Sequence, residues 1–263
     1  MGEAASVFFL SVLQGIAEFL PVSSSGHLVL AEHLLKLESP GMRLEVALHV
    51  GTMFSVLFFY RERVLGLVKG VFSGCKESWQ TAVNIAVSAI PAIVFYLLFH
   101  KKIDASFENP RAVGVALLFT GVLLLATRWL PRKDGMVTLP RAVAIGIAQA
   151  IAVLPGVSRS GMTISTARVA GVAPEKAAEF SFLMSLPLIA GAALMDALHS
   201  LSSTDAGQTG ISFGLLAAGA VVAGLVGYVA LTLLVRLLRG HHFWLFGVYC
   251  LIAGSLTLAF VNT

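Results

Sequence analysis

The chain has 263 residues, of which 57% are hydrophobic and only 12% charged, and its mean hydropathy is +0.88. Soluble domains carry about 25% charged residues, so this composition excludes a soluble protein and indicates an integral membrane protein. The net charge of +4 is modest, no nucleic-acid partner is expected, and two cysteines are too few for a disulfide framework. Long apolar runs between short basic loops indicate helices, because strands of a membrane barrel alternate over about 10 residues.

The first predicted element is a broken hydrophobic segment at the N-terminus. Apolar sequence runs from Ala4 to Leu20, breaks at Pro21–Gly26, and continues to about Leu35. Each arm is shorter than the roughly 20 residues of a membrane span, so the pattern predicts a re-entrant hairpin, with one long kinked helix as the alternative. Polar and ionisable residues are costly inside a hydrophobic chain, which makes the stretch Gln14–His27 (QGIAEFLPVSSSGH) a candidate functional site.

Six membrane spans and a second broken element follow. The predicted spans are Glu45–Tyr60, Gln80–Phe99, Arg111–Leu130, Lys176–Leu198, Ile211–Leu238 and Phe243–Val261. A basic loop is predicted between the first two spans, and a loop without Lys or Arg at Ser200–Gly210. Between the third and fourth spans, a short apolar arm at Arg141–Leu154 is broken at PGVSRSG (155–161) and resumes to about Val169. This second element has the same pattern as the first.

The two broken elements align when the chain is shifted by 135 residues. Seven of the thirteen positions from 14 to 26 are then identical, including a paired Ser-x-Ser-Gly. We interpret this as an internal duplication, with halves of about 1–135 and 136–263 in a single membrane domain. Three spans separate the two hairpins, and an odd number makes them enter from opposite faces. The predicted fold is therefore an all-α integral membrane protein with six transmembrane helices plus two re-entrant helical hairpins in an inverted-topology repeat, a class that places its site near the membrane midplane.

The distribution of Lys and Arg predicts the orientation. One face collects Arg61, Arg63, Lys69, Lys76, Arg128, Arg132, Lys133, Arg141, Arg168, Lys176, Arg236 and Arg239, and the other collects Lys36, Arg43, Lys101, Lys102 and Arg111. Twelve against five makes the first face cytoplasmic by the positive-inside rule. Both termini then lie outside, and the first hairpin opens to the outer face.

The side chains at the two breaks fit phosphoryl transfer. Glu18, Ser24 and His27 come from the first break and Arg159 from the second. A hydroxyl beside a carboxylate or imidazole base is the usual arrangement of an activated nucleophile, and guanidinium binds phosphate in a bidentate manner. Helices that restart at the breaks present free N–H groups to an anion. The predicted catalytic residues are these four, and the predicted substrate-binding residues are Gln14, Ser23, Ser25, Gly26, Ser158, Ser160, Gly161 and Thr163.

Structural roles explain many of the same residues. Glu18 and Arg159 form a buried ion pair in this interpretation, His27 caps or links helices, and most of the serines bond to the backbone. Gln14 and its repeat partner Gln149 hold helices together. Position near a span start is enough to explain three further residues, namely Glu45, His49 and Glu179.

Both motifs resemble those of the bacterial undecaprenyl pyrophosphate phosphatases, the bacitracin-resistance family. The (E/Q)xxxE signature of that family matches Gln14 and Glu18, followed by the serine run and His27, and PGxSRSxxT matches residues 155–163. The resemblance implies a multi-pass protein of the bacterial plasma membrane. It would hydrolyse the C55 polyprenyl pyrophosphate to the monophosphate at the outer face and so recycle the lipid carrier for peptidoglycan synthesis. Bacitracin would compete by binding the substrate.

The resemblance also implies a divalent cation, Mg2+ or Ca2+, with Glu18 as a candidate ligand. Gln14 takes the less acidic option of the motif, which weakens a metal site made of two carboxylates. Essential residues of the family carry over to Glu18, Ser24, His27 and Arg159. The nucleophile is left open between Ser24 and His27, and so are the chain-length selectivity and the oligomeric state, a homo-oligomer included.

Two other functions remain open from the sequence. Inverted repeats with broken helices are also found in transporters, so a transporter or flippase of a polyprenyl phosphate carrier lipid is the main alternative. A carrier needs Arg159 for the phosphate but no nucleophile or base, which makes Ser24 and His27 the discriminating residues. The broader lipid phosphate phosphatases expect a histidine soon after their Ser-Arg pair, and the stretch after Arg159 contains none.

Overall fold

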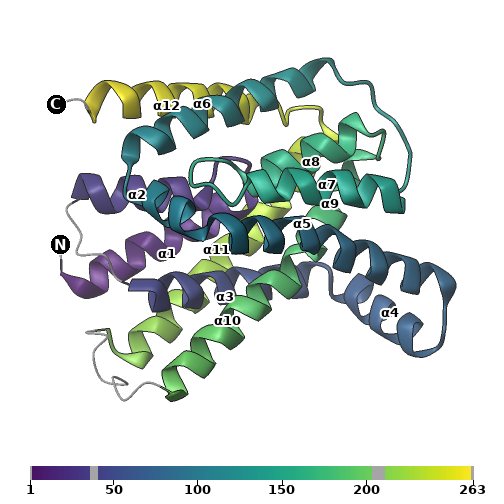
Figure 1. Ribbon diagram of the computed structural model, residues 1–263, viewed down its shortest axis with the longest axis horizontal. Helices are drawn as coiled ribbons and strands as arrows, with labels where there is room; N and C mark the ends of the chain where they lie inside the picture. Colours follow the sequence, from purple (N-terminus) through teal and green to yellow (C-terminus); the bar gives the residue numbers. More distant parts are fainter. Residues whose placement is uncertain (1, 36–40, 203–210, 262–263) are drawn as a thin grey trace.

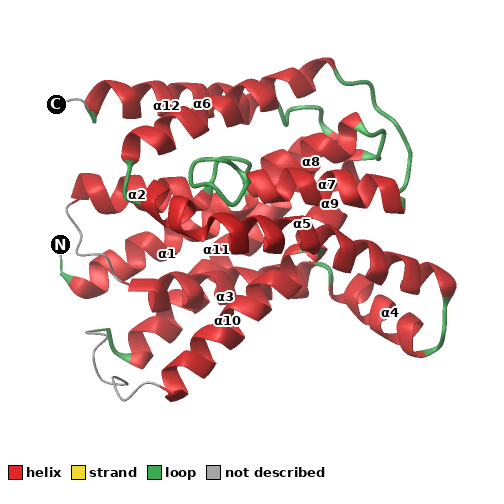
Figure 2. Ribbon diagram, in the orientation of Figure 1, coloured by secondary structure: helices red, strands yellow, loops and turns green. Residues whose placement is uncertain are grey.

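The chain folds as a bundle of helices joined by short loops (Figures 1 and 2). The computed structural model describes residues 2–35, 41–202 and 211–261. Its helices are α1 (Glu3–Phe19), α2 (Ser24–Leu35), α3 (Gly41–Phe59), α4 (Arg61–Phe72), α5 (Lys76–Phe107), α6 (Pro110–Ala126), the short 3-10 helix η1 (Thr127–Trp129), α7 (Leu139–Ile151), α8 (Arg159–Val169), α9 (Pro174–Leu183), α10 (Ser185–Ser202), α11 (Phe213–Arg239) and α12 (Leu245–Phe260). The described residues contain no strand, which confirms the all-α prediction.

Four helical stretches are long and apolar enough to cross a membrane among the described residues. They are Lys76–Phe107, Pro110–Trp129, Pro174–Met195 and Phe213–Arg239, and a fifth is counted if α3 and the bent α4 form one span. The sixth predicted span corresponds to α12, which is apolar but only 16 residues long. A multi-pass membrane protein is therefore shown, whereas the exact count of six spans stays a prediction. Part of the predicted loop Ser200–Gly210, and Lys36, lie outside the described residues.

The predicted basic loop after the first span is wrong, because most of it is helical. α4 starts directly after Tyr60, where the chain bends by 80° from α3, and α5 already begins at Lys76. Three of its basic residues, Arg61, Arg63 and Lys69, therefore lie on a helix. A helix with charged residues at regular intervals has a low average hydropathy, so hydropathy alone does not distinguish it from a polar loop.

The fourth predicted span is one apolar run in the sequence but two helices in the structure. α9 ends at Leu183 and α10 starts at Ser185. Pro187 explains the interruption, because a proline removes its own N–H and its ring clashes with the carbonyl four residues earlier, here that of Leu183. The junction between α9 and α10 lies beside the breaks of the two hairpins.

The two hairpins reach the middle of the bundle from opposite ends (Figure 1). α2 and α8 begin 135 residues apart, and so do α6 and α12. Helix packing shows the same correspondence between the two halves. α1 lies against α11, and α7, which corresponds to α1, lies against α5, which corresponds to α11. The two breaks touch: a Cβ added to Gly26 would lie 2.8 Å from the Gly156 Cα atom. These observations support the inverted repeat and place both breaks in one small volume.

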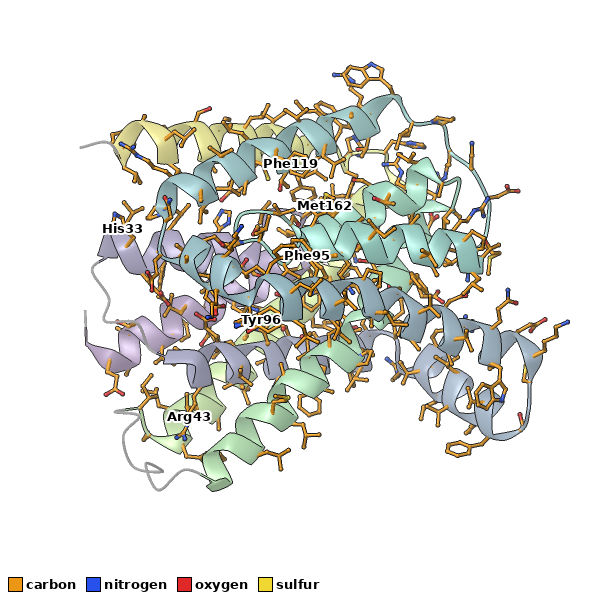
Figure 3. All side chains as sticks on the ribbon, in the orientation of Figure 1. His33, Arg43, Phe95, Tyr96, Phe119 and Met162 are labelled. Carbon is orange, nitrogen blue, oxygen red and sulfur yellow. The ribbon has the colours of Figure 1, made fainter. Side chains whose placement is uncertain are left out.

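Large apolar side chains cover the outside of the bundle (Figure 3). Tyr96 and Phe119 are 46% and 47% exposed, and α11 turns Val221, Leu225 and Val229 outward. A soluble protein rarely exposes apolar surface so continuously, whereas hydrocarbon chains of a bilayer are its natural neighbours. Polar side chains instead lie inside, including Gln14, Glu18, Ser23 and Gln149 in the two broken elements and a run of serine and threonine hydroxyls beside them.

Candidate active site

The first break is a tight backbone turn that ends α1 and starts α2. Pro21 cannot continue the helix, and Ser23 follows with φ of +70°, in the left-handed region that non-glycine residues rarely adopt. Ser23 Oγ accepts hydrogen bonds from the Gly26 N–H at 3.3 Å and from the Gly156 N–H at 3.1 Å. One serine thus caps α2 and also ties the first break to the second.

The second break has the same capping arrangement and an additional anchor from α6. Ser158 Oγ accepts a hydrogen bond from the Gly161 N–H at 3.1 Å and so caps α8. Thr120 of α6 donates its hydroxyl to the Gly156 carbonyl at 3.0 Å and accepts from the Ser158 N–H at 3.2 Å. A positive φ of +90° and the Val113 carbonyl, 2.6 Å from an added Cβ, require glycine at position 156. The first residue of α8, Arg159, is thereby aimed at the first break.

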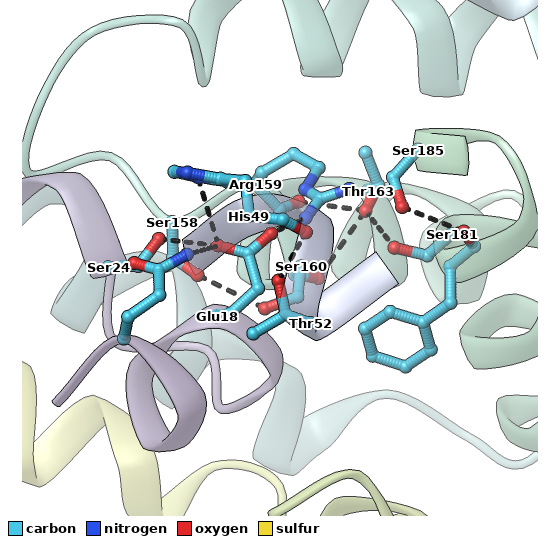
Figure 4. A network of polar contacts seen from close by, with 12 residues as sticks. Glu18, Ser24, His49, Thr52, Ser158, Arg159, Ser160, Thr163, Ser181 and Ser185 are labelled. Carbon is cyan, nitrogen blue, oxygen red and sulfur yellow. Dashed lines mark hydrogen bonds and ion pairs between the residues drawn. The ribbon is translucent and has the colours of Figure 1, made fainter. Parts of the chain in front are cut away.

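Glu18 is the centre of a polar cluster formed by Gln14, Glu18, Ser24, His49 and Arg159 (Figure 4). Ser24 Oγ donates to Glu18 Oε2 at 2.8 Å, and Gln14 Nε2 donates to the same oxygen at 3.0 Å. The guanidinium of Arg159 donates from Nη2 to Glu18 Oε1. The side chain of Glu18 is only 4% exposed, so this carboxylate depends on the positive charge of Arg159 to lie there.

A cavity of about 380 Å³ opens beside the polar cluster. Its polar wall contains the predicted residues Glu18, Ser23, Ser24, Ser25, Ser158 and Arg159. Its apolar wall contains Val46, Ala92, Phe107, Val153, Leu188 and Ile189, from α3, α5, α10 and the second break. A cavity lined both by charged and hydroxyl groups and by apolar side chains suits an amphiphile with an anionic head group.

The remaining predicted residues support this wall without lining the cavity. Gly26 and Gly161 supply the capping N–H groups described above. Ser160 Oγ lies 3.3 Å from Ser158 Oγ, and Thr163 Oγ1 lies 2.6 Å from Ser181 Oγ while it also donates to the Arg159 carbonyl at 2.8 Å. These contacts fix the first turn of α8 and so the direction of the Arg159 side chain.

His27 lies apart from the polar cluster, although it is only three residues from Ser24. Its Nδ1 is 2.9 Å from the Ser23 carbonyl oxygen, and its Nε2 is 2.7 Å from the hydroxyl of Tyr249 in α12. A carbonyl only accepts, so Nδ1 carries the hydrogen and Nε2 accepts from Tyr249 in the neutral ring. Both ring nitrogens are thereby engaged, and His27 is not among the residues that line the cavity.

Sequence reasoning gave too little weight to three residues of the cavity wall. Glu45 and His49, both of α3, and Gln149 of α7 line the cavity. His49 Nε2 is 3.5 Å from Glu18 Oε2, and its side chain is 31% exposed. The spacing of four between Glu45 and His49 places two ionisable groups on one face of an apolar helix and could have indicated these two residues.

The protein side chains do not form a resident metal site in the described part of the chain. No group of three His, Cys, Asp or Glu residues lies close enough together there. Three hydrogen-bond donors, Arg159, Ser24 and Gln14, already surround the carboxylate of Glu18, the ligand considered from the sequence. These residues therefore do not fit a bound divalent cation of their own.

Comparison with known proteins supplies the family. Residues 7–256 match the model of the family described as bacitracin resistance protein BacA. The chain belongs to this family. Among its relatives are proteins named undecaprenyl-diphosphatase from Salinibacter ruber, 39% identical with 95% of this chain and 96% of the relative aligned, and from Desulfatibacillum aliphaticivorans, 38% identical with 96% of each aligned. A relative of the same name from Korarchaeum cryptofilum is 33% identical and covers 98% of this chain. Membership thus extends over nearly the whole bundle, both breaks included.

Proposed function

We propose that the protein hydrolyses undecaprenyl pyrophosphate to undecaprenyl phosphate and phosphate, as the names of its relatives state for them. The observation that carries this proposal is the hydrogen bond of 2.8 Å from Ser24 Oγ to Glu18 Oε2 beside the Arg159 guanidinium. It pairs a nucleophile with a base at an anion site. The apolar wall of the cavity accommodates the first isoprenyl units, and the rest of the chain extends into the bilayer.

The reaction follows from these contacts in two steps. Ser24 Oγ attacks the terminal phosphorus and forms an Oγ–P bond while the bridging P–O bond breaks and the polyprenyl monophosphate leaves. Glu18 Oε2 takes the proton of Ser24. Arg159 and the N–H groups at the starts of α2 and α8 stabilise the charge on the transferring phosphoryl group. Water then cleaves the phosphoserine and releases phosphate.

The geometry favours Ser24 over His27 as the nucleophile. A phosphohistidine requires a free ring nitrogen that faces the substrate, and both nitrogens of His27 are engaged with Ser23 and Tyr249. The geometry also favours hydrolysis over transport alone, because a carrier for a phosphate lipid needs no hydroxyl aligned on a buried carboxylate. His27 in this proposal holds the start of α2 against α12.

The second part of the proposal concerns topology and orientation. The chain has six spans and two re-entrant hairpins, both termini lie outside, and the cavity opens to the outer face of the bacterial plasma membrane. A product formed at that face is the lipid carrier ready for recycling into cell-wall synthesis. The prediction rests on the excess of Lys and Arg on one face of the predicted topology, four of which, Arg61, Arg63, Lys69 and Lys76, lie in α4 and at the start of α5.

Cys75 offers a test of that orientation. It precedes α5 at the predicted cytoplasmic end, and the pKa of its thiol lies below the usual value because the Ser78 backbone N–H and hydroxyl donate to the sulfur. A lower pKa gives more thiolate at neutral pH and faster alkylation. We expect a membrane-impermeant maleimide to label inside-out vesicles at Cys75 and to leave intact spheroplasts unlabelled. Buried Cys250 is the internal control. Labelling of spheroplasts at Cys75 would reverse the orientation.

The activity itself is tested by phosphate release from a polyprenyl pyrophosphate in detergent, with and without EDTA. The cavity holds one guanidinium against the carboxylates of Glu18 and Glu45, so a bare pyrophosphate meets unfavourable charge. Mg2+ is commonly held by substrate phosphates, and we expect EDTA to raise KM at least about 10-fold, with Mg2+ or Ca2+ restoring it. The melting temperature of the substrate-free protein should not change with EDTA. If folded protein releases no phosphate in the presence of Mg2+, the phosphatase proposal is wrong and the lipid-transport alternative is favoured.

A further inference from the structure

We propose that His49 is a further catalytic residue of this site, an acid–base group that accepts from Glu18 the proton that Glu18 takes from Ser24. The inference rests on the proposed phosphatase function. It concerns a residue of α3, 31 positions beyond Glu18, that belongs to neither broken element. Four observations carry it: the contact of His49 with Glu18, the assignment of its ring hydrogens, its exposure to the cavity, and the engagement of His27 elsewhere.

The ring hydrogens of His49 follow from its neighbours. Nδ1 is 2.8 Å from the Glu45 carbonyl oxygen, which can only accept, so Nδ1 carries a hydrogen in every state of the ring. Nε2 is therefore the nitrogen that gains and loses a proton. It is 3.5 Å from Glu18 Oε2, the same oxygen that accepts the hydroxyl of Ser24. One oxygen of Glu18 thus contacts both a proton source, Ser24, and a proton acceptor, His49.

The position of His49 suits exchange in both directions. Its helix is fixed locally, because the Thr52 hydroxyl donates to the His49 carbonyl at 2.9 Å. The imidazole is 31% exposed and lines the cavity, whereas Glu18 is 4% exposed, so a proton can pass from the buried carboxylate to a group that the substrate and water reach. The charged groups around the ring are Glu18, Arg159 beyond it, and Glu45 of the same helix.

The proton balance of the reaction shows what this transfer achieves. After the first step Ser24 is phosphorylated and Glu18 holds the serine proton. Transfer of that proton to His49 Nε2 returns Glu18 to its basic form. Glu18 then accepts a proton from the attacking water, the Oγ–P bond breaks, and this proton returns to Ser24 Oγ. The proton on His49 leaves through the cavity with the product phosphate, so each turnover is balanced without another reactant.

This scheme predicts a specific kinetic defect. Without His49, the first step still proceeds, because Ser24 and Glu18 are intact, but Glu18 is slow to recover for the second. We expect His49→Ala and His49→Gln to keep a burst of about one polyprenyl phosphate per enzyme, with kcat lowered at least about 10-fold and KM changed little. Phosphoserine at position 24 should accumulate and be visible by mass spectrometry. Gln keeps polarity at the site but cannot carry a proton, so it separates proton transfer from hydrogen bonding.

The experiment includes a rescue and a matched control. Imidazole should enter the space left in His49→Ala and restore part of kcat, whereas it should not raise that of wild type. His100→Ala is the control, since His100 is exposed on α5 and bonds its own helix through Nδ1 at 3.3 Å. Wild-type kcat in His49→Gln, or a burst reduced in proportion to kcat without imidazole rescue, would overturn the proposal. Absence of phosphate release from wild type would instead overturn the proposed function.

Discussion

Replacement of Ser24 by alanine is expected to lower phosphate release on the order of 1,000-fold or more, because it removes the atom that attacks phosphorus. Ser24 donates to Glu18 but accepts no bond that holds the breaks together, a role that belongs to Ser23. The fold of the variant should therefore be intact. Steady-state release measured beside the melting temperature tests both expectations. Ser6→Ala, at an exposed position of α1, is the matched control and should behave as wild type.

Trapping the phosphoenzyme distinguishes Ser24 from the rival nucleophile. Acid quench of wild type during turnover, followed by peptide mapping, should place the phosphate on Ser24. The Ser24→Ala protein should show neither a burst nor a labelled peptide. Label on His27, or a Ser24→Ala protein with near wild-type kcat, would contradict the assignment and would mean that the ring of His27 leaves Tyr249 during the reaction.

Replacement of Arg159 by alanine is expected to affect both activity and stability. Removal of the guanidinium from the transferring phosphoryl group should lower kcat/KM by on the order of 100-fold or more. The carboxylate of Glu18 would also lose its buried counter-charge, and breaking a buried ion pair from one side costs about 3–5 kcal/mol, less here because Arg159 is 21% exposed. Phosphate release and thermal unfolding in detergent measure the two effects.

A second substitution separates those effects. Glu18→Gln combined with Arg159→Ala removes both charges, so stability should recover toward wild type while activity stays lost. Arg61→Ala is the matched control, since Arg61 pairs with Glu62 on the surface and such pairs contribute only about 0–1 kcal/mol. If the Arg159→Ala protein were as active as wild type, the Glu18–Arg159 contact would be a purely structural ion pair.

Predictions that depend on local sequence were mostly confirmed. Both breaks exist where the sequence predicts them to within a few residues: α1 ends at Phe19, shortly before Pro21, and α7 ends at Ile151, four residues before Pro155, because proline acts on the backbone without tertiary help. The helices restart at Ser24 and Arg159, inside the predicted breaks. Errors occur where hydropathy is a poor guide: the charges of α4 interrupt the apolar average, so hydropathy predicts a loop where the chain is helical. The interruption at Met184 had a sequence cause in Pro187, four residues after the end of α9.

The sequence by itself determined the helical membrane architecture and the two broken elements, with Glu18, Ser24 and His27 as candidates at the first break, since these depend on composition and on residues within one hairpin. The tertiary structure paired Ser24 with Glu18. The tertiary structure decided which other side chains meet that pair. It turns His27 toward Tyr249, a partner 222 positions later, and brings His49 to Glu18 from α3. Local patterns cannot fix such contacts, because helix packing sets the rotation of each helix and therefore which of its polar groups face the cavity.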